Sequence, residues 1–257
     1  MAVNILEKKI RAAMSEGRPA LIPFLTAGFP DATRFWPALM ELNDNGADII
    51  EIGVPFSDPV ADGPVVENAS RRALSDGVNL RQIITELTER KGLITTGVVL
   101  MGYLNPFLQY GFKNLAKDAK AAGVHGLIVP DLPFEESAPL RGILKKHGIA
   151  LIALVGPNTD KNRMALYASE NEGYVYVVSI MGTTGEQNAL ASQAAETIRR
   201  ARSVFTVPVA LGFGLRNPAQ LESLPEDAQP DAVVFGSALL THLDEGKSAA
   251  EFLARWR

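Results

Sequence analysis

The chain has 257 residues, of which 47% are hydrophobic, and its 25 basic and 29 acidic residues give a net charge of −4. This length suits either two small domains or one (β/α)8 barrel, and the apolar fraction is enough for a large core. The small negative charge excludes nucleic-acid binding by bulk electrostatics. The sequence contains no cysteine, which excludes disulfides, thiolate nucleophiles and cysteine-ligated metals.

No segment of the chain is apolar enough to predict a membrane span, since none approaches the roughly 20 apolar residues that a bilayer requires. The first 17 residues include Glu7 and lack a continuous apolar stretch, so they are not typical of a secretory signal. A cytoplasmic enzyme is therefore expected.

Eight short apolar runs alternate with amphipathic stretches along the chain. Near-continuous hydrophobicity over about five to seven residues is typical of parallel strands that are covered on both faces. The runs occupy residues 20–28, 48–54, 96–102, 125–131, 149–156, 174–179, 207–214 and 231–237. This alternation predicts an α/β fold, a (β/α)8 TIM barrel, with a doubly wound open sheet as the alternative. No linker or low-complexity segment divides the sequence, which predicts a single barrel domain over residues 1–257.

The amphipathic stretches have recognisable helix ends. Residues 3–16 predict an extra helix lying across the N-terminal end of the barrel. Asp31 and Asn79 are suited to cap the helices that follow them, because their side-chain oxygens can accept hydrogen bonds from the first free N–H groups. Glycines end four of the predicted helices, at positions 46, 92, 123 and 148.

The stretch IEIGVPFSDPVADG, residues 50–63, combines a strand with a long loop and two carboxylates, Glu51 and Asp62. Alternation along the strand places Ile50 and Ile52 on one face and Glu51 on the other, inside the barrel near its mouth. Desolvation there would raise the pKa of Glu51 and let it give and take a proton near neutral pH. Two plainer readings remain open: Glu51 makes only a structural hydrogen bond, and Asp62 is only a helix N-cap. Asp58 is interpreted as a turn residue.

Glycines at the ends of the last two predicted strands indicate a phosphate site. Residues 211–214 read LGFG and residues 235–237 read FGS. Their backbone N–H groups, with the positive end of the last helix dipole, suit an anion at the place where barrel enzymes commonly bind phosphate. The segment GTTGE, residues 182–186, is a third candidate. The plainer alternative is that these glycines only end helices.

Four aromatic residues, Phe24, Tyr103, Tyr176 and Phe213, lie on or just beyond strand segments and are suited to enclose a planar group. Core packing is the alternative for each of them. Tyr174 and Tyr176 share one face of their strand, so at least one of the two hydroxyls needs a polar partner inside.

Residues that are missing from the strand ends narrow the chemistry. The three histidines, His125, His147 and His242, all lie away from C-terminal strand ends, which disfavours a histidine metal cluster. No strand end carries a lysine, which disfavours a Schiff-base lyase. Carboxylate acid–base chemistry on a phosphorylated substrate, without a metal, remains.

The sequence resembles the tryptophan synthase alpha subunit family. Residues 50–63 match the family signature, and further matching blocks follow in the same order along the chain. These are PFLTAGFP (23–30), MGYLNP (101–106), VPDLPFEES (129–137), TGEQN (184–188), GFG (212–214) and GSA (236–238). The resemblance implies cleavage of indole-3-glycerol phosphate to indole and glyceraldehyde 3-phosphate, with Glu51 and Asp62 as the catalytic carboxylates.

The resemblance also implies binding roles for other residues. Those expected at the substrate are Phe24, Tyr103, Tyr176, Thr184 and Phe213, and those expected at its phosphate are Gly185, Gly214, Gly236 and Ser237. The expected surface for a beta subunit consists of Pro55, Phe56, Ser57, Asp58, Asn105 and Pro106. That partner would form an alpha2beta2 hetero-tetramer with this chain and would hold the pyridoxal phosphate, so no cofactor is expected here.

One segment departs from the family pattern. Residues 179–186 read SIMGTTGE, with Ile180 and Met181 where many members have a more polar lead-in. Thr184 still matches the family, so closure of this loop is expected, whereas the energetics of closure and its coupling to the partner stay open. Two other functions compete with the leading one: a stand-alone lyase that releases indole, and a non-catalytic scaffold that activates a partner.

Overall fold

In the computed structural model of the chain, the described residues are 3–178, 187–212 and 214–257. Their strands all pair in parallel in one sheet, in the order β5-β4-β3-β2-β1-β9-β8-β7-β6. The strands are β1 (Ala20–Thr26), β2 (Ile49–Gly53), β3 (Gly97–Met101), β4 (Gly126–Ile128), β5 (Ala150–Leu151), β6 (Ala153–Val155), β7 (Val175–Val178), β8 (Val209–Gly212) and β9 (Ala232–Phe235).

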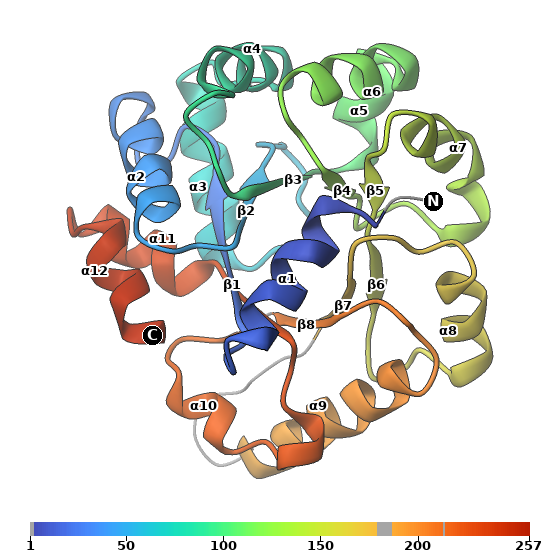
Figure 1. The fold of residues 1–257 in the computed structure, drawn as a ribbon. Coiled ribbons are helices and arrows are strands. Elements are labelled where there is room, and N and C mark those ends of the chain that lie inside the picture. The colour runs from blue at the N-terminus through green and yellow to red at the C-terminus, as the bar shows by residue number, and fades with distance from the viewer. Residues whose placement is uncertain (1–2, 179–186, 213) are drawn as a thin grey trace.

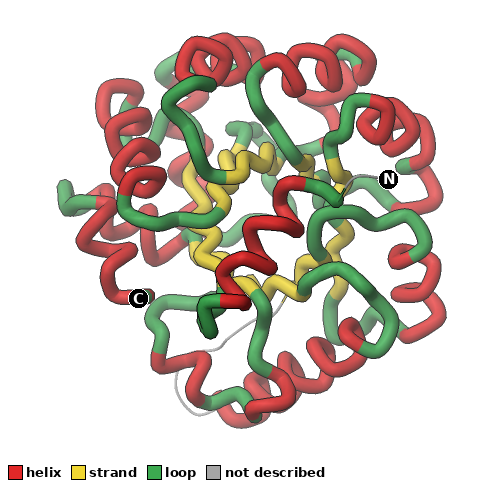
Figure 2. The backbone as a smooth tube through the Cα atoms, in the orientation of Figure 1, coloured by secondary structure: helices red, strands yellow, loops and turns green. Residues whose placement is uncertain are grey.

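The two edges of this sheet meet in a single stretch of chain. Only Ile152 separates β5, which pairs with β4, from β6, which pairs with β7. The strands consequently form a closed ring with the helices outside it (Figure 2). The predicted (β/α)8 barrel is confirmed, the open sheet is wrong, and each predicted run contains a strand, the fifth in two pieces. At the break, the side chain of Asn171 accepts a hydrogen bond from Ala153 N at 3.0 Å.

Helices cover the outside of the barrel, and both predicted caps are confirmed. Asp31 Oδ1 accepts hydrogen bonds from Thr33 N and Arg34 N, and Asn79 Oδ1 accepts one from Gln82 N. The helices are α1 (Ile5–Ser15), α2 (Ala32–Asp44), α3 (Pro64–Ser75), α4 (Leu80–Arg90), α5 (Leu104–Tyr110), α6 (Phe112–Ala121), α7 (Ala138–Lys146), α8 (Lys161–Ala168), α9 (Gln187–Arg202), α10 (Ala219–Glu222), α11 (Ser237–Asp244) and α12 (Ala249–Leu253), with short 3₁₀ turns at Phe134–Glu136, Glu226–Ala228 and Ala254–Trp256.

Helix α1 lies across one opening of the barrel, as predicted (Figure 1). Its buried face consists of Leu6, Ile10 and Ala13. Leu6 occupies the space left by two strand glycines, since a Cβ atom at Gly97 would lie 2.9 Å from Leu6 Cδ2 and one at Gly126 would lie 2.8 Å from Leu6 Cδ1. The N-terminal end of the barrel is therefore filled by side chains, which leaves the opposite end for a site.

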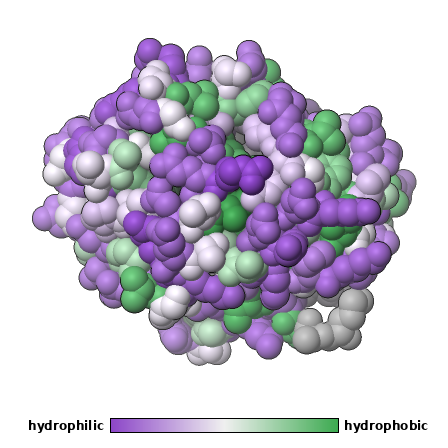
Figure 3. Space-filling view, turned by 90° about the horizontal axis from the view of Figure 1, so that it is seen from above, coloured by the Kyte–Doolittle hydropathy of each residue, from purple (hydrophilic) through white to green (hydrophobic). Residues whose placement is uncertain are grey.

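The outer surface mixes residue types. The face in Figure 3 is largely hydrophilic, with hydrophobic residues in small separate groups. Within the part of the chain that the structure describes, no helix has the length and apolar character needed to cross a membrane.

We expect Leu6→Ala to lower the free energy of unfolding by about 2–5 kcal/mol, because it leaves a cavity under α1 that the strand glycines cannot fill. Urea unfolding measures this change. Leu93→Ala is the matched control, since Leu93 is 63% exposed and its truncation should change stability little. Equal effects for the two variants would contradict the sealing role of α1.

Candidate active site

Glu51 lies in the middle of β2 between aliphatic residues. Ile50, Glu51 and Ile52 are all fully buried. Side chains alternate along a strand, so Glu51 faces away from the two isoleucines, and it lines a cavity inside the barrel. The inward orientation predicted for Glu51 is therefore observed.

The two oxygens of the Glu51 carboxyl have different surroundings. Tyr174, just before β7, donates a hydrogen bond from its hydroxyl to Glu51 Oε1 at 2.6 Å. Glu51 Oε2 is buried and has no hydrogen-bond partner among the described residues. Burial raises the pKa of Glu51 to about 8, although the hydrogen bond from Tyr174 opposes this rise. Glu51 therefore holds a proton near neutral pH and keeps one oxygen available for a ligand.

Asp62 returns to the cavity at the far end of the loop that leaves β2. The hydroxyl of Tyr103 donates to Asp62 Oδ2 at 3.2 Å and accepts from Ala61 N at 2.9 Å, which fixes the end of the loop. Burial raises the pKa of Asp62 to about 6, with an opposing contribution from Tyr103. The N-cap alternative is wrong, because α3 begins after Gly63 with no side-chain cap.

Both carboxyls line one cavity of about 180 Å³, at the end of the barrel opposite α1. Five further predicted site residues line it: Phe24, Tyr176, Gly214, Gly236 and Ser237. Tyr103 lines a small adjoining cavity together with Phe24 and Asp62. Three predicted residues, Thr184, Gly185 and Phe213, lie outside the described residues, as does the unusual lead-in at Ile180 and Met181. The structure therefore brings together every described residue that was predicted to contact the substrate or its phosphate.

The two glycine turns meet at the same cavity. Gly214 follows β8 with a φ of +80°, a conformation that other residues rarely adopt. Gly236 is the N-cap of α11, and Ser237 is its first residue. A Cβ atom at Gly236 would lie 2.9 Å from Phe24 Cδ1. Neither glycine ends a helix, so the plainer reading is wrong for both, and their N–H groups remain suited to an anion.

Several residues at or beside the cavity had no site role predicted from the sequence. Tyr174 is the polar partner of Glu51, and its shared strand face with Tyr176 was the signal that pointed to such a contact. The other lining residues were given no site role, although Gly63, Met101 and Ala238 lie within the motif blocks that carry the family resemblance. They are Gly63, Val66, Met101, Leu215, Arg216, Val234 and Ala238.

The predicted partner surface lies beside the cavity. Five of its six residues, Pro55, Phe56, Ser57, Asn105 and Pro106, line a groove of about 450 Å³ together with residues of α3, α4 and α5. Asp58 does not line this groove, and its carboxylate accepts a hydrogen bond from Ser57 Oγ at 2.5 Å. Asp58 O also accepts a hydrogen bond from Val60 N at 2.9 Å, so Asp58 is part of a turn, as interpreted from the sequence.

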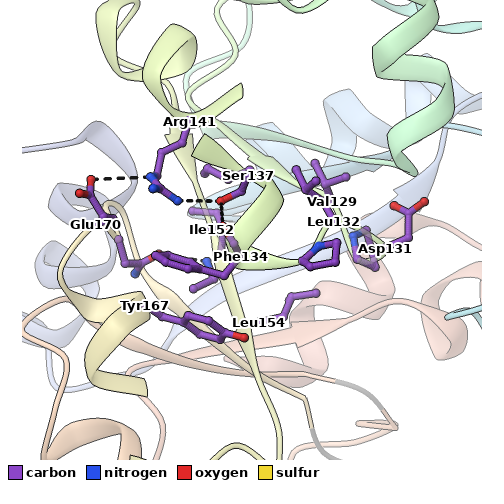
Figure 4. Close-up of a pocket in the computed structure, with 15 residues that line it drawn as sticks. Val129, Asp131, Leu132, Phe134, Ser137, Arg141, Ile152, Leu154, Tyr167 and Glu170 are labelled. Atoms are coloured by element: carbon purple, nitrogen blue, oxygen red, sulfur yellow. Dashed lines mark hydrogen bonds and ion pairs between the residues drawn. The ribbon is translucent and has the colours of Figure 1, made fainter. Parts of the chain in front are cut away.

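A further cavity of about 290 Å³ lies between α7, α8 and the broken fifth strand (Figure 4). Two of its three charged side chains, Arg141 and Glu170, form an ion pair, and Asp131 accepts a hydrogen bond from Leu104 N. Arg141 stacks over the ring of Phe134 at 4.6 Å, donates to Ser137 Oγ at 2.6 Å and lies 3.7 Å from Glu170. No buried carboxyl oxygen is free there among the described residues, so the cavity with Glu51 is the candidate active site despite its smaller volume.

The histidines lie away from this site. His125 precedes β4 and accepts a hydrogen bond at Nδ1 from Val98 N, while His147 follows α7 and His242 lies in α11. Over the described ranges, no three His, Asp or Glu side chains come together in a way that suits a metal ion.

A closed (β/α)8 barrel with two raised-pKa carboxyls and paired glycine turns at its strand ends defines an acid–base enzyme for a phosphorylated substrate. Residues 10–255 match the family model described as tryptophan synthase alpha chain. The tryptophan synthase alpha chain of Desulfovibrio desulfuricans is 73% identical over 255 residues, covering 99% of this chain and 100% of the relative. That of Nitratidesulfovibrio vulgaris is 59% identical, covering 100% and 99%. A solved structure of Mycobacterium tuberculosis tryptophan synthase aligns with a TM-score of 0.88 at 34% identity, over 99% of this chain and 96% of that one.

The chain therefore belongs to the tryptophan synthase alpha chain family. It is a lyase of tryptophan biosynthesis that cleaves indole-3-glycerol phosphate to indole and glyceraldehyde 3-phosphate, as the resemblance implied.

Burial of Glu51 predicts a pH-dependent stability. Its pKa is about 8 in the folded chain, against an ordinary value of 4.5, so between these values the folded state binds more protons than the unfolded state. The contribution of Glu51 to stability therefore falls as pH rises from 4.5 to 8. Urea unfolding measures this change. Between pH 5 and pH 8, the free energy of unfolding of the wild-type chain should fall by more than about 1 kcal/mol relative to that of Glu51→Gln. A pH-independent difference would contradict the raised pKa.

Proposed function

We propose that Glu51 transfers the protons of the cleavage and that Asp62 holds the indole N–H. The observation that carries this proposal is the buried, unpartnered Oε2 of Glu51 in the cavity that also contains the two glycine turns. The proton on Glu51 makes it an acid at neutral pH, whereas Asp62, with a pKa of about 6, is largely ionised there.

The proposed reaction has two proton transfers. Glu51 first donates its proton to indole C3, which leaves a positive charge on the ring nitrogen that the Asp62 carboxylate stabilises. The Glu51 carboxylate then takes the proton of the hydroxyl next to C3. The bond between C3 and the side chain breaks, its electron pair returns to the ring, and an aldehyde forms. Glu51 ends protonated, as it began.

The same proposal gives the other predicted site residues roles in binding the substrate and its phosphate. The phosphate binds the N–H groups of Gly214, Gly236 and Ser237 at the positive end of α11. Phe24 and Tyr176, which line the same cavity, contact the indole ring, and Tyr103 holds Asp62 in position. Thr184, Gly185 and Phe213 keep their predicted roles at the substrate and its phosphate.

We further propose that the beta subunit docks in the groove lined by Pro55, Phe56, Ser57, Asn105 and Pro106, with Asp58 at its edge, in an alpha2beta2 hetero-tetramer. Exposed apolar residues support this proposal: Leu74, which lines the groove, is 37% exposed, and Val60 and Leu108, on the loop after β2 and on α5, are 86% and 57% exposed. Acid–base cleavage needs only the two carboxyls, so pyridoxal phosphate is assigned to the beta subunit. Because a charged phosphate ester does not cross a membrane unaided, the complex is placed in the cytoplasm.

Glu51→Gln should lower the turnover of indole-3-glycerol phosphate by about 10²-fold or more, because the amide cannot donate or accept the transferred protons. Indole release is the measurement, with and without the beta subunit. Glu67→Gln, on the exposed side of α3, is the matched control and should retain turnover. Near-normal cleavage by Glu51→Gln, with unchanged folding, would remove Glu51 from the mechanism.

Leu74→Asp should weaken binding of the beta subunit about tenfold or more, because it places a charge in the proposed groove. Titration calorimetry measures the affinity, and sedimentation measures the mass of the complex. Leu166→Asp, at a residue of α8 that is 46% exposed, is the matched control. If both variants bound the beta subunit equally well, the groove would not be the interface. A stand-alone lyase, the competing hypothesis, would show no acceleration by that subunit.

A further inference from the structure

We propose that Arg216 binds the phosphate of the substrate and gives the cavity its preference for a phosphorylated ligand. This inference rests on the proposed function, which places the phosphate at the glycine turns. It adds a cationic side chain to a site that is otherwise built from neutral N–H groups and the Ser237 hydroxyl.

Arg216 is the only cationic residue among the described residues that line the active-site cavity, which also contains the carboxyls of Glu51 and Asp62. It follows Gly214 by two positions and shares the cavity lining with Gly236 and Ser237. The cation is therefore on the loop that is proposed to hold the phosphate.

Arg216 is an exposed residue, and its guanidinium makes no hydrogen bond or ion pair within the described part of the chain. Other arginines near the barrel ends are engaged. Arg72 pairs with Asp244, Arg199 with Asp227, and Arg202 with Asp231, each at 2.7–2.8 Å. Arg216 is therefore available to a ligand without first breaking an internal contact.

The backbone around Arg216 is held in place although its side chain is not. Gln220 Oε1 accepts hydrogen bonds from Arg216 N at 2.5 Å and from Asn217 N at 3.2 Å, and Gln220 Nε2 donates to Gly214 O at 3.3 Å. Leu215 is 2% exposed and anchors the same turn in the core. One side chain of α10 thus fixes the backbone on both sides of Arg216, which holds this residue in the lining of the cavity.

A cation at this position would offset the negative charges of the phosphate and of Asp62. A phosphate monoester carries close to two negative charges at neutral pH, and it must enter a cavity that contains the ionised Asp62. Backbone N–H groups supply only partial charges, whereas a guanidinium offers a full charge and paired donors that match phosphate oxygens. The competing interpretation is that Arg216 is an ordinary solvated side chain.

The role of Arg216 in phosphate binding is tested with the variants Arg216→Ala and Arg216→Lys. Titration calorimetry measures ligand affinity for the full chain, alone and in complex with the beta subunit. We expect Arg216→Ala to weaken binding of glyceraldehyde 3-phosphate about tenfold, with a smaller loss for Arg216→Lys. Binding of indole, which has no phosphate, should not change. In turnover, the KM for indole-3-glycerol phosphate should rise about tenfold while kcat changes less than twofold. Lys8→Ala, which removes the same charge from α1 at the opposite end of the barrel, should change none of these quantities.

Unchanged affinity of Arg216→Ala for glyceraldehyde 3-phosphate would overturn the assignment. An equal loss of affinity for indole would also overturn it, because it would indicate damage to the whole cavity rather than loss of a phosphate contact. These binding measurements need no turnover. A failure of the mechanism, seen as an active Glu51→Gln variant, is therefore distinguishable from a failure of the role of Arg216.

Discussion

A single carboxyl buried in the barrel, that of Glu51, is the constraint on which the rest of the site depends. One hydrogen bond from Tyr174 partly compensates its burial, and its other oxygen has no protein partner among the described residues. Water must be kept away from Glu51 for its pKa to stay raised. The barrel excludes water at its N-terminal end. Helix α1 fills the N-terminal opening with Leu6 against the strand glycines, and the carboxyl lines the cavity at the opposite end.

The two acids of the site differ because their surroundings differ. Glu51 is fully buried, whereas Asp62 lies on a loop and is only half-buried. Burial consequently raises the pKa of Glu51 to about 8 and that of Asp62 to about 6. Each carboxyl accepts one hydrogen bond from a tyrosine hydroxyl: Glu51 from Tyr174, and Asp62 from Tyr103. Near neutral pH this arrangement provides one proton donor and one anion from the same chemical group, which are the two states that the proposed cleavage requires.

Features encoded over a few consecutive residues could be predicted from the sequence. The apolar runs gave the strands, Asp31 and Asn79 gave helix starts, and a charge within an apolar run marked Glu51. Features that depend on distant contacts could not be predicted. The break at Ile152 arises where the sheet changes partner from β4 to β7. Asp62 is suited by its local sequence to cap a helix, but α3 begins after Gly63, and Asp62 instead accepts a hydrogen bond from Tyr103, 41 residues away.

The loop that joins β2 to α3 serves the cavity and the groove at once. Its first part, with Phe56, lines the groove, and its last part carries Asp62 into the cavity. Tyr103 contacts both parts, because its ring stacks on Phe56 at 5.2 Å and its hydroxyl donates to Asp62. A protein that binds in the groove is therefore two contacts away from the carboxyl of Asp62. Movement of Phe56 on docking would shift Tyr103, and loss of its hydrogen bond would raise the pKa of Asp62 and reduce the anion at the indole nitrogen.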